Sequence, residues 1–168
     1  MYLMTCTCPD LAFPLSVLSC SVATGRHRPV QLTAAVRVAK YLATTLGVGL
    51  VLGGTQPVVL TDYCDPSYTD DMETQRSTQG YCFSLGVGAL SWRSARSSSV
   101  AQSSAEVEIY AGAMSAQELR WLTFLLTGLG EWPCSAPTLL TNSKAMILLC
   151  REPRLEGRVK LRLRGLSS

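Results

Sequence analysis

The sequence predicts an α/β fold built around a mixed β-sheet. Apolar residues make up 47% of the 168 residues, which is enough to bury a core and argues against wholesale disorder. Three short β-rich runs with brief connections lie within residues 57–92, and a long helical pattern and a further strand follow them. Strands joined by short loops pair antiparallel, whereas a strand reached through a crossover helix pairs parallel. The order βββαβα over residues 57–150 therefore predicts an antiparallel meander extended by a parallel strand.

Residues 1–56 are expected to form a helical appendage. Pro9 and Asp10 can open a helix, because proline fits the first turn and an acidic side chain suits the helix N-terminus. Residues 30–46 carry apolar side chains at near-helical spacing and end on Gly47. The uncharged run 41–61 is long enough to span a membrane, but its glycines and proline indicate a helix end, a loop and a strand.

The strands are expected at 57–65, 80–85, 89–92 and 137–141. The first run begins at Pro57 and closes on Asp65 and Pro66, and the turn Gly86–Gly88 joins the second run to the third. A polar loop is expected over 66–79. These connections favour neighbouring strands in one sheet.

The longest helix is expected over 104–129. Ser103 and Glu106 match a capping box, in which the hydroxyl and the carboxylate satisfy free backbone amides reciprocally. Its apolar positions define the expected core face, and they include Val107, Ala111, Met114, Trp121, Leu122, Leu125 and Leu129. A second helix is expected over 143–150, before Pro153.

Charge and cysteine content exclude several classes of protein. The net charge is 15 − 12 = +3, but residues 151–164 hold six basic and two acidic residues, so this tail carries +4. The tail can track phosphates or be a solvated end, and the sequence leaves both open. Seven cysteines without a CxxC motif, beside one histidine, do not form a zinc-site pattern, so reduced, buried thiols are expected. Residues 11–23 lack the basic region of a signal peptide, so the chain is expected to be intracellular, without a membrane anchor.

Three polar residues stand where this fold would bring them together. Asp65 closes the first strand, Glu108 lies in the first turns of the long helix, and Asn142 ends the fourth strand. Carboxylates converging from different elements suit a hard cation such as Mg²⁺. A pair of such ions can stabilise the attacking and leaving oxygens of a phosphodiester. Most residues of these kinds at strand ends and in first helical turns are turn and cap residues.

Three long blocks carry a family resemblance. They are YCDPSYTDDMETQRSTQGYCFSLGVGALSW (63–92), SSAEVEIYAGAMSAQELRWLTFLL (103–126) and TNSKAMILL (141–149). In order and spacing they resemble the RNase H domain of copia-type LTR-retrotransposon Pol polyproteins. The segments 1–20 and 28–45 resemble the connection from the reverse transcriptase. The resemblance implies a connection remnant over 1–56 and an RNase H-like domain with a basic tail over 57–168.

The resemblance also implies roles for individual residues. Asp65 matches the first metal-binding aspartate and Glu108 the glutamate, while Asn142 stands where the family has a third carboxylate. The fourth aspartate would lie beyond Ser168, after a fifth strand that is expected to be missing from this chain. After Lys160 the sequence departs from the family pattern.

The implied reaction is hydrolysis of the RNA strand of an RNA–DNA hybrid, with Mg²⁺ (or Mn²⁺) held by Asp65 and Glu108. Asn142 would weaken the metal site, so the chain is expected to be impaired or inactive. No small-molecule substrate is expected. Two alternatives remain open, which are a non-catalytic nucleic-acid-binding remnant and an unstable transposon fragment without function.

Other residues have weaker signals. Arg93 and Arg96 beside a strand, and Lys160, Arg162 and Arg164 in the tail, are candidate nucleic-acid contacts. The run 68–71 resembles the Tyr-x-Asp-Asp motif of reverse transcriptases, but it stands in a polar loop rather than on an apolar hairpin. Polymerase chemistry is therefore not expected.

Overall fold

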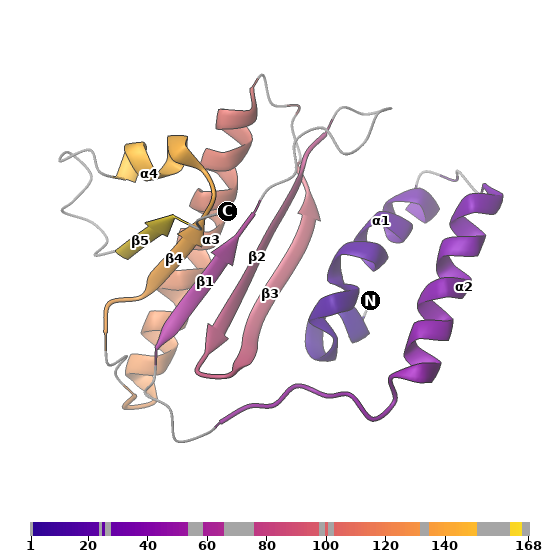
Figure 1. Ribbon diagram of the computed structural model, residues 1–168, viewed down its shortest axis with the longest axis horizontal. Helices are drawn as coiled ribbons and strands as arrows, with labels where there is room; N and C mark the ends of the chain where they lie inside the picture. The colour runs from indigo at the N-terminus through magenta and orange to yellow at the C-terminus, as the bar shows by residue number, and fades with distance from the viewer. Residues whose placement is uncertain are drawn as a thin grey trace.

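A computed structural model gives the fold as one mixed β-sheet with helices on both of its faces. The structure describes residues 2–23, 25, 28–53, 59–65, 76–97, 100, 103–131, 135–150 and 162–165. The sheet order is β3-β2-β1-β4-β5. Figure 1 shows the long helix α3 behind the sheet and the helices α1 and α2 beside β3.

The meander comes first. Strands β1 (Leu60–Cys64), β2 (Thr78–Leu85) and β3 (Gly88–Arg96) pair antiparallel, with Tyr63 opposite Cys82 and Cys82 opposite Trp92. Gly86 takes a positive φ of 65° in the tight turn between β2 and β3, a conformation that glycine adopts without steric cost. The expected meander is therefore confirmed.

Strand β4 (Thr138–Thr141) follows the crossover helix α3 (Ser104–Gly128) and pairs parallel to β1, as expected. The hydroxyl of Ser103 accepts a hydrogen bond from the Glu106 backbone amide at 3.2 Å and caps α3. Helix α4 (Lys144–Cys150) begins directly after β4. The carboxyl ends of the neighbouring strands β1 and β4 thus lie side by side.

The expectation that the fifth strand is missing is wrong. Strand β5 (Arg162–Gly165) pairs parallel to β4, with Leu139 opposite Leu163. Without β5, strand β4 would be at the edge of the sheet and would present unpaired backbone groups. A nearby segment can satisfy these groups by pairing with β4, which is the physical reason for β5. The tail supplies such a segment, because leucine and arginine alternate there with the period of a strand.

The core lies between the sheet and α3. One cluster joins the sheet residues Leu60, Tyr81 and Phe83 to Leu119, Leu122 and Leu126 of α3. A second joins Cys64 and Leu139 to Ala111 and Met146. Because side chains alternate along a strand, Gly80, Cys82 and Trp92 belong to the opposite, outer face of the sheet.

The N-terminal helices occupy part of that outer face. A short π-helical turn (Leu3–Thr7) and a 3₁₀ turn (Pro9–Leu11) lead into α1 (Ala12–Ala23), which packs against β3. Helix α2 (Pro29–Thr44) packs against α1 and has no buried residue. The indole nitrogen of Trp92 donates to the Met4 carbonyl oxygen at 2.7 Å, which fixes the N-terminal segment to β3.

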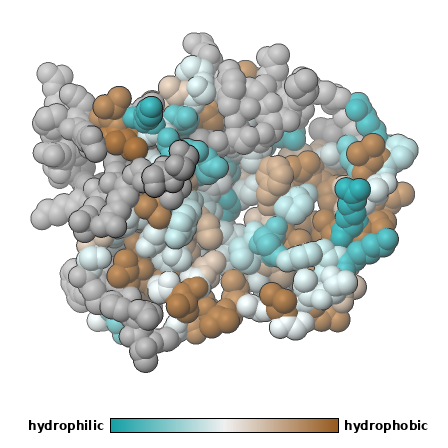
Figure 2. All heavy atoms as spheres, in the orientation of Figure 1, coloured by the Kyte–Doolittle hydropathy of each residue, from teal (hydrophilic) through white to brown (hydrophobic). Residues whose placement is uncertain are grey.

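Apolar side chains also reach the surface. Figure 2 shows apolar residues between polar ones over the N-terminal helices and along the lower edge of the view. Those of α2 and the segment after it include Val30, Leu32, Leu46, Val48, Val51 and Leu52, each at least 62% exposed. Charged residues make up only 16% of the sequence, which agrees with this exposed apolar surface.

Candidate active site

Two of the three expected site residues meet at the sheet edge. Asp65 directly follows β1 and Asn142 directly follows β4, whose pairing sets Tyr63 opposite Leu140. The side-chain amide of Asn142 donates to Asp65 Oδ1 at 3.3 Å. The parallel register therefore brings these residues into contact across 77 positions of the sequence.

Glu108 comes from the second turn of α3. Its Oε2 accepts a hydrogen bond from the hydroxyl of Ser143, the residue after Asn142. Ser143 is 2% exposed, and the same hydroxyl accepts a hydrogen bond from the Met146 backbone amide at 3.0 Å. Ser143 thus caps α4 and holds the Glu108 carboxylate at the same time.

Asp65, Asn142, Ser143 and Glu108 form one site, because Asn142 and Ser143 are consecutive and each is hydrogen-bonded to one of the two carboxylates. Each of the two carboxylates is met by a neutral donor, the amide of Asn142 for Asp65 and the hydroxyl of Ser143 for Glu108. Sequence analysis missed Ser143, although a serine before a short helix is a recognisable cap signal. Its link to Glu108, 35 residues away, has no local signature.

The donor set suits a hard cation only in part. Asp65 and Glu108 offer carboxylate oxygens, the ligands that Mg²⁺ prefers. Asn142 can offer one neutral oxygen, but its amide nitrogen faces Asp65. In the described part of the chain, no three cysteine, histidine, aspartate or glutamate residues gather in a way that could hold a metal ion.

A third carboxylate, Asp62, lies buried beside this site. It is 0% exposed on the β1 face that meets α3, and Ser115 donates its hydroxyl hydrogen to Oδ2. Its Oδ1 has no hydrogen-bond partner among the described residues. Burial raises the pKa of Asp62 to about 7, and the Ser115 hydrogen bond opposes that shift.

Asp62 was not selected from the sequence. Its signal was its phase in β1, because Asp62 alternates with Leu60 and Cys64 and must share their buried face. The same burial raises the pKa of the Cys64 thiol to about 12, with smaller contributions from the nearby charges of Asp62 and Asp65. Cys64 is therefore a protonated, unreactive thiol at neutral pH.

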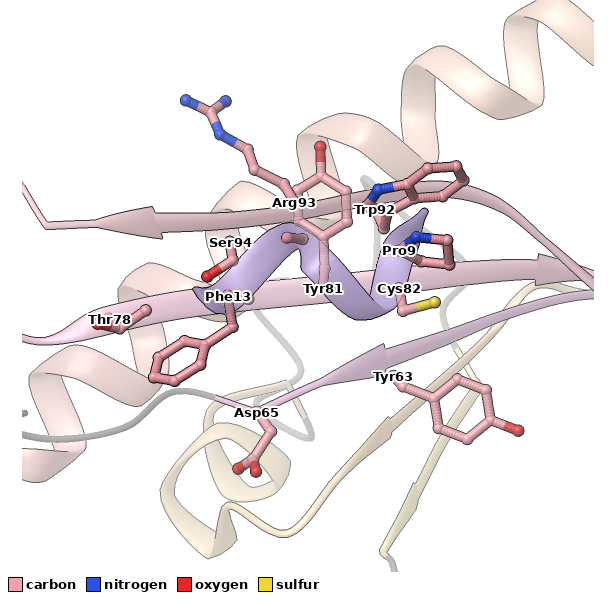
Figure 3. Close-up of a pocket in the computed structure, with 12 residues that line it drawn as sticks. Pro9, Phe13, Tyr63, Asp65, Thr78, Tyr81, Cys82, Trp92, Arg93 and Ser94 are labelled. Atoms are coloured by element: carbon pink, nitrogen blue, oxygen red, sulfur yellow. The ribbon is translucent and has the colours of Figure 1, made fainter. Parts of the chain in front are cut away.

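A groove opens on the outer face of the sheet beside Asp65, with a volume of about 300 Å³ (Figure 3). We call it the outer groove. It is lined by Pro9, Ala12 and Phe13 from the N-terminal segment, Tyr63 and Asp65 from β1 and its end, Thr78, Gly80, Tyr81 and Cys82 from β2, and Trp92, Arg93 and Ser94 from β3.

The basic residues expected to contact nucleic acid are placed differently. Arg93 is exposed and lines the outer groove together with Asp65. Arg96 ends β3 and is half-buried. Arg162 and Arg164 belong to β5, whereas Lys160 lies outside the described residues, as does the run 68–71.

The remaining sequence expectations concern thiols and membranes. The five cysteines whose side chains the structure describes form no disulfide bond, and Cys6 is exposed rather than buried. Within the described residues, no helix combines the length and the apolar character that crossing a bilayer requires.

Comparison with known proteins finds relatives along most of the chain. It is 41% identical to the secreted RxLR effector protein 161 of Plasmopara viticola over 123 residues, which are 73% of this chain and 85% of that protein. It is 31% identical over 156 residues, or 92% of its length, to the retrovirus-related Pol polyprotein from transposon RE1 of Arabidopsis thaliana. Over 130 residues it is 34% identical to the corresponding polyprotein from transposon TNT 1-94 of Nicotiana tabacum.

The matched part differs in extent between these relatives. The chain spans about 10% of the length of each of the two polyproteins. No family model matches the chain, and no solved structure matches it significantly.

Proposed function

Because this chain belongs to the family of retrovirus-related Pol polyproteins from copia-type transposons, we propose that residues 57–168 are an RNase H-type domain with an impaired metal site. The observation that carries the proposal is the contact between Asp65 and Asn142 at the ends of adjacent parallel strands. Glu108 is tied to the next residue, Ser143. Residues 1–56 would then be the remnant of the reverse-transcriptase connection.

The proposed ancestral reaction is hydrolysis of the RNA strand of an RNA–DNA hybrid. Asp65 and Glu108 would hold Mg²⁺, which when bound activates a water molecule and stabilises the leaving 3′ oxygen. Ser143 orients the Glu108 carboxylate through its hydroxyl, and α4 fixes Ser143 in turn. Three elements, β1, α3 and β4, thus set the positions of the two carboxylates before any substrate arrives.

Asn142 supports the proposal that the metal site is impaired. A neutral amide removes one negative charge relative to an aspartate, and its nitrogen donates to Asp65 Oδ1, an oxygen that a cation would otherwise use. Two carboxylates then carry −2 against the +4 of two divalent ions. Weaker cation binding removes part of the several kcal/mol of transition-state stabilisation that metal ions supply.

The first test is cleavage of a labelled RNA–DNA hybrid by the purified chain with Mg²⁺ and then Mn²⁺. We expect little or no cleavage, and any residual cleavage should disappear in Glu108→Gln, which keeps the shape of the side chain and removes its charge. Rapid Mg²⁺-dependent cleavage by the unmodified chain would contradict the impaired site. Cleavage that persists in Glu108→Gln would contradict its assignment.

The second candidate function is nucleic-acid binding without cleavage. The Asn142–Asp65 hydrogen bond favours it, because it satisfies the site without a metal ion. The basic residues 151–164 favour it as well, since each phosphate contact adds salt-dependent affinity. Hybrid binding that weakens steeply between low and high salt, with no cleavage in either metal, would support this function over the first.

A further inference from the structure

The outer groove has a floor of small side chains. Thr78, Gly80 and Cys82 of β2 and Ser94 of β3 form it, on the face of the sheet away from α3. A Cβ atom built on Gly80 would lie 3.4 Å from the Arg93 carbonyl oxygen and 3.8 Å from the Asp65 carbonyl oxygen. Among the described residues, no side chain comes within 4 Å of that position, so they leave the space above Gly80 open.

Aromatic side chains stand at the sides of this floor. Phe13 of α1 is 53% exposed and Tyr63 of β1 is 49% exposed, although both line the groove. Figure 3 shows them on either side of Asp65, one from the helix and one from the strand. The helical wall is held in place by the hydrogen bond from Trp92 to Met4.

Polar groups are few in the groove and specifically placed. The Ser94 hydroxyl oxygen is buried and has no hydrogen-bond partner among the described residues. Asp65 supplies a negative charge at one end of the groove. Although Arg93 lines the groove, it lies opposite Tyr81 in the sheet, so its side chain extends on the α3 side and its charge lies outside the groove.

We propose that the outer groove binds one unpaired nucleobase, which stacks against Phe13 and hydrogen-bonds to Ser94, with its phosphate outside the groove. This inference rests on the proposed function, because it names a subsite for nucleic acid beside Asp65. Base stacking on exposed aromatic side chains is the usual way in which proteins hold single-stranded nucleic acid.

The groove fits a base better than other occupants. The groove volume of about 300 Å³ is at the lower end of the range for ligand pockets, which suits a single base. A helix, which is about 10–12 Å wide with its side chains, needs more room than this. The Asp65 carboxylate repels a phosphate inside the groove, so the charged part of a nucleotide belongs outside it. A purely apolar side chain would leave the Ser94 hydroxyl unsatisfied.

The test uses the full 168-residue chain and two ten-nucleotide DNA strands. One strand carries 2-aminopurine at its centre and the other carries an abasic site there. Gly80→Val places a branched side chain in the open space, and Phe13→Ala removes the stacking surface. Phe124→Ala is the matched control, because Phe124 is a comparably exposed aromatic residue (67%) on α3.

We expect 2-aminopurine fluorescence to fall on binding and the abasic strand to bind roughly ten-fold more weakly or worse. Gly80→Val and Phe13→Ala should abolish the fluorescence change, whereas Phe124→Ala should retain it. All three variants should still unfold cooperatively in urea. Equal affinity for both strands, or unaffected binding by the groove variants, would overturn the inference. If the intact RNA–DNA hybrid still binds in that case, the proposed function stands. If neither strand nor hybrid binds, both fail.

Discussion

Asp62 shows how one residue can set the response of the whole chain to pH. Its carboxyl group is fully buried with one hydroxyl donor, and Oδ1 has no partner among the described residues. Burial raises its pKa from 3.8 to about 7, so the folded state holds the proton that the unfolded state releases near pH 4. This contribution to stability is fully present below pH 4 and is lost as pH rises through 7.

The first prediction follows from that sign. Asp62→Asn should remove the loss of stability between pH 4 and 7, and at pH 8 it should be more stable than the unmodified chain by up to about 4 kcal/mol. Urea unfolding of both proteins at pH 4, 6 and 8 measures the difference. A difference that does not change with pH would mean that Asp62 titrates normally.

The second prediction concerns Ser143, which caps α4 and holds Glu108. Ser143→Ala should cost about 1–3 kcal/mol of unfolding free energy, because a helix cap is lost and a partly buried hydrogen bond to a carboxylate is broken. Ser143→Thr keeps the hydroxyl and should recover most of this loss. Equal stability of the alanine and threonine variants would show that the hydroxyl does not act as described.

At the level of single residues, part of the site followed from the sequence. Asp65 and Asn142 could be expected to meet, because both follow strands that a crossover helix makes parallel. The contacts of Ser143 and Asp62 could not be predicted, because their partners Glu108 and Ser115 are distant in sequence. Only the packing of α3 brings these pairs close. Short-range patterns carry no information about such pairs.

Among the elements, α3 shows why the phase of a helix is harder to predict than its extent. Its observed bounds, 104–128, differ by one residue from the expected 104–129. Trp121, however, was expected in the core and is 56% exposed. The buried stripe runs through Val107, Ala111, Ser115, Leu119, Leu122 and Leu126. Because α3 carries apolar residues on its outer side as well, hydrophobicity alone did not identify the buried side.

The third prediction concerns the contact between Gly88, at the start of β3, and Val51, in the segment before β1. A Cβ atom on Gly88 would lie 2.1 Å from the Val51 carbonyl oxygen, a backbone atom that cannot move without its neighbours. Gly88→Ala should therefore displace residues 46–53 and speed hydrogen exchange there. The neighbouring Val87→Ala, at an exposed position, is the control. Unchanged exchange in Gly88→Ala would mean that the contact does not hold this segment.

For the whole molecule, β5 decides how the sheet ends. The sequence could not predict this strand, since a four-residue alternation of arginine and leucine also suits a solvated tail. Pairing with β4 covers the backbone groups that would otherwise leave an aggregation-prone edge. The basic tail is thus part of the fold at Arg162–Gly165.

The fourth prediction tests that role. A chain ending at residue 161 should lose stability by roughly 1–3 kcal/mol and aggregate more readily, because strand pairing and edge protection are both removed. A chain ending at Gly165 retains β5 and serves as the control. Light scattering and urea unfolding compare the two. Indistinguishable behaviour would mean that β5 contributes nothing to the folded state.

The central claim is that this chain keeps an RNase H-type site which one neutral side chain has weakened. Asn142→Asp tests it most directly, because it restores a third carboxylate where the amide now donates to Asp65. Hybrid cleavage with Mg²⁺ should rise at least ten-fold in Asn142→Asp and should vanish again when Glu108→Gln is added. Absence of cleavage in a cooperatively folded Asn142→Asp protein, at any Mg²⁺ or Mn²⁺ concentration, would contradict the claim.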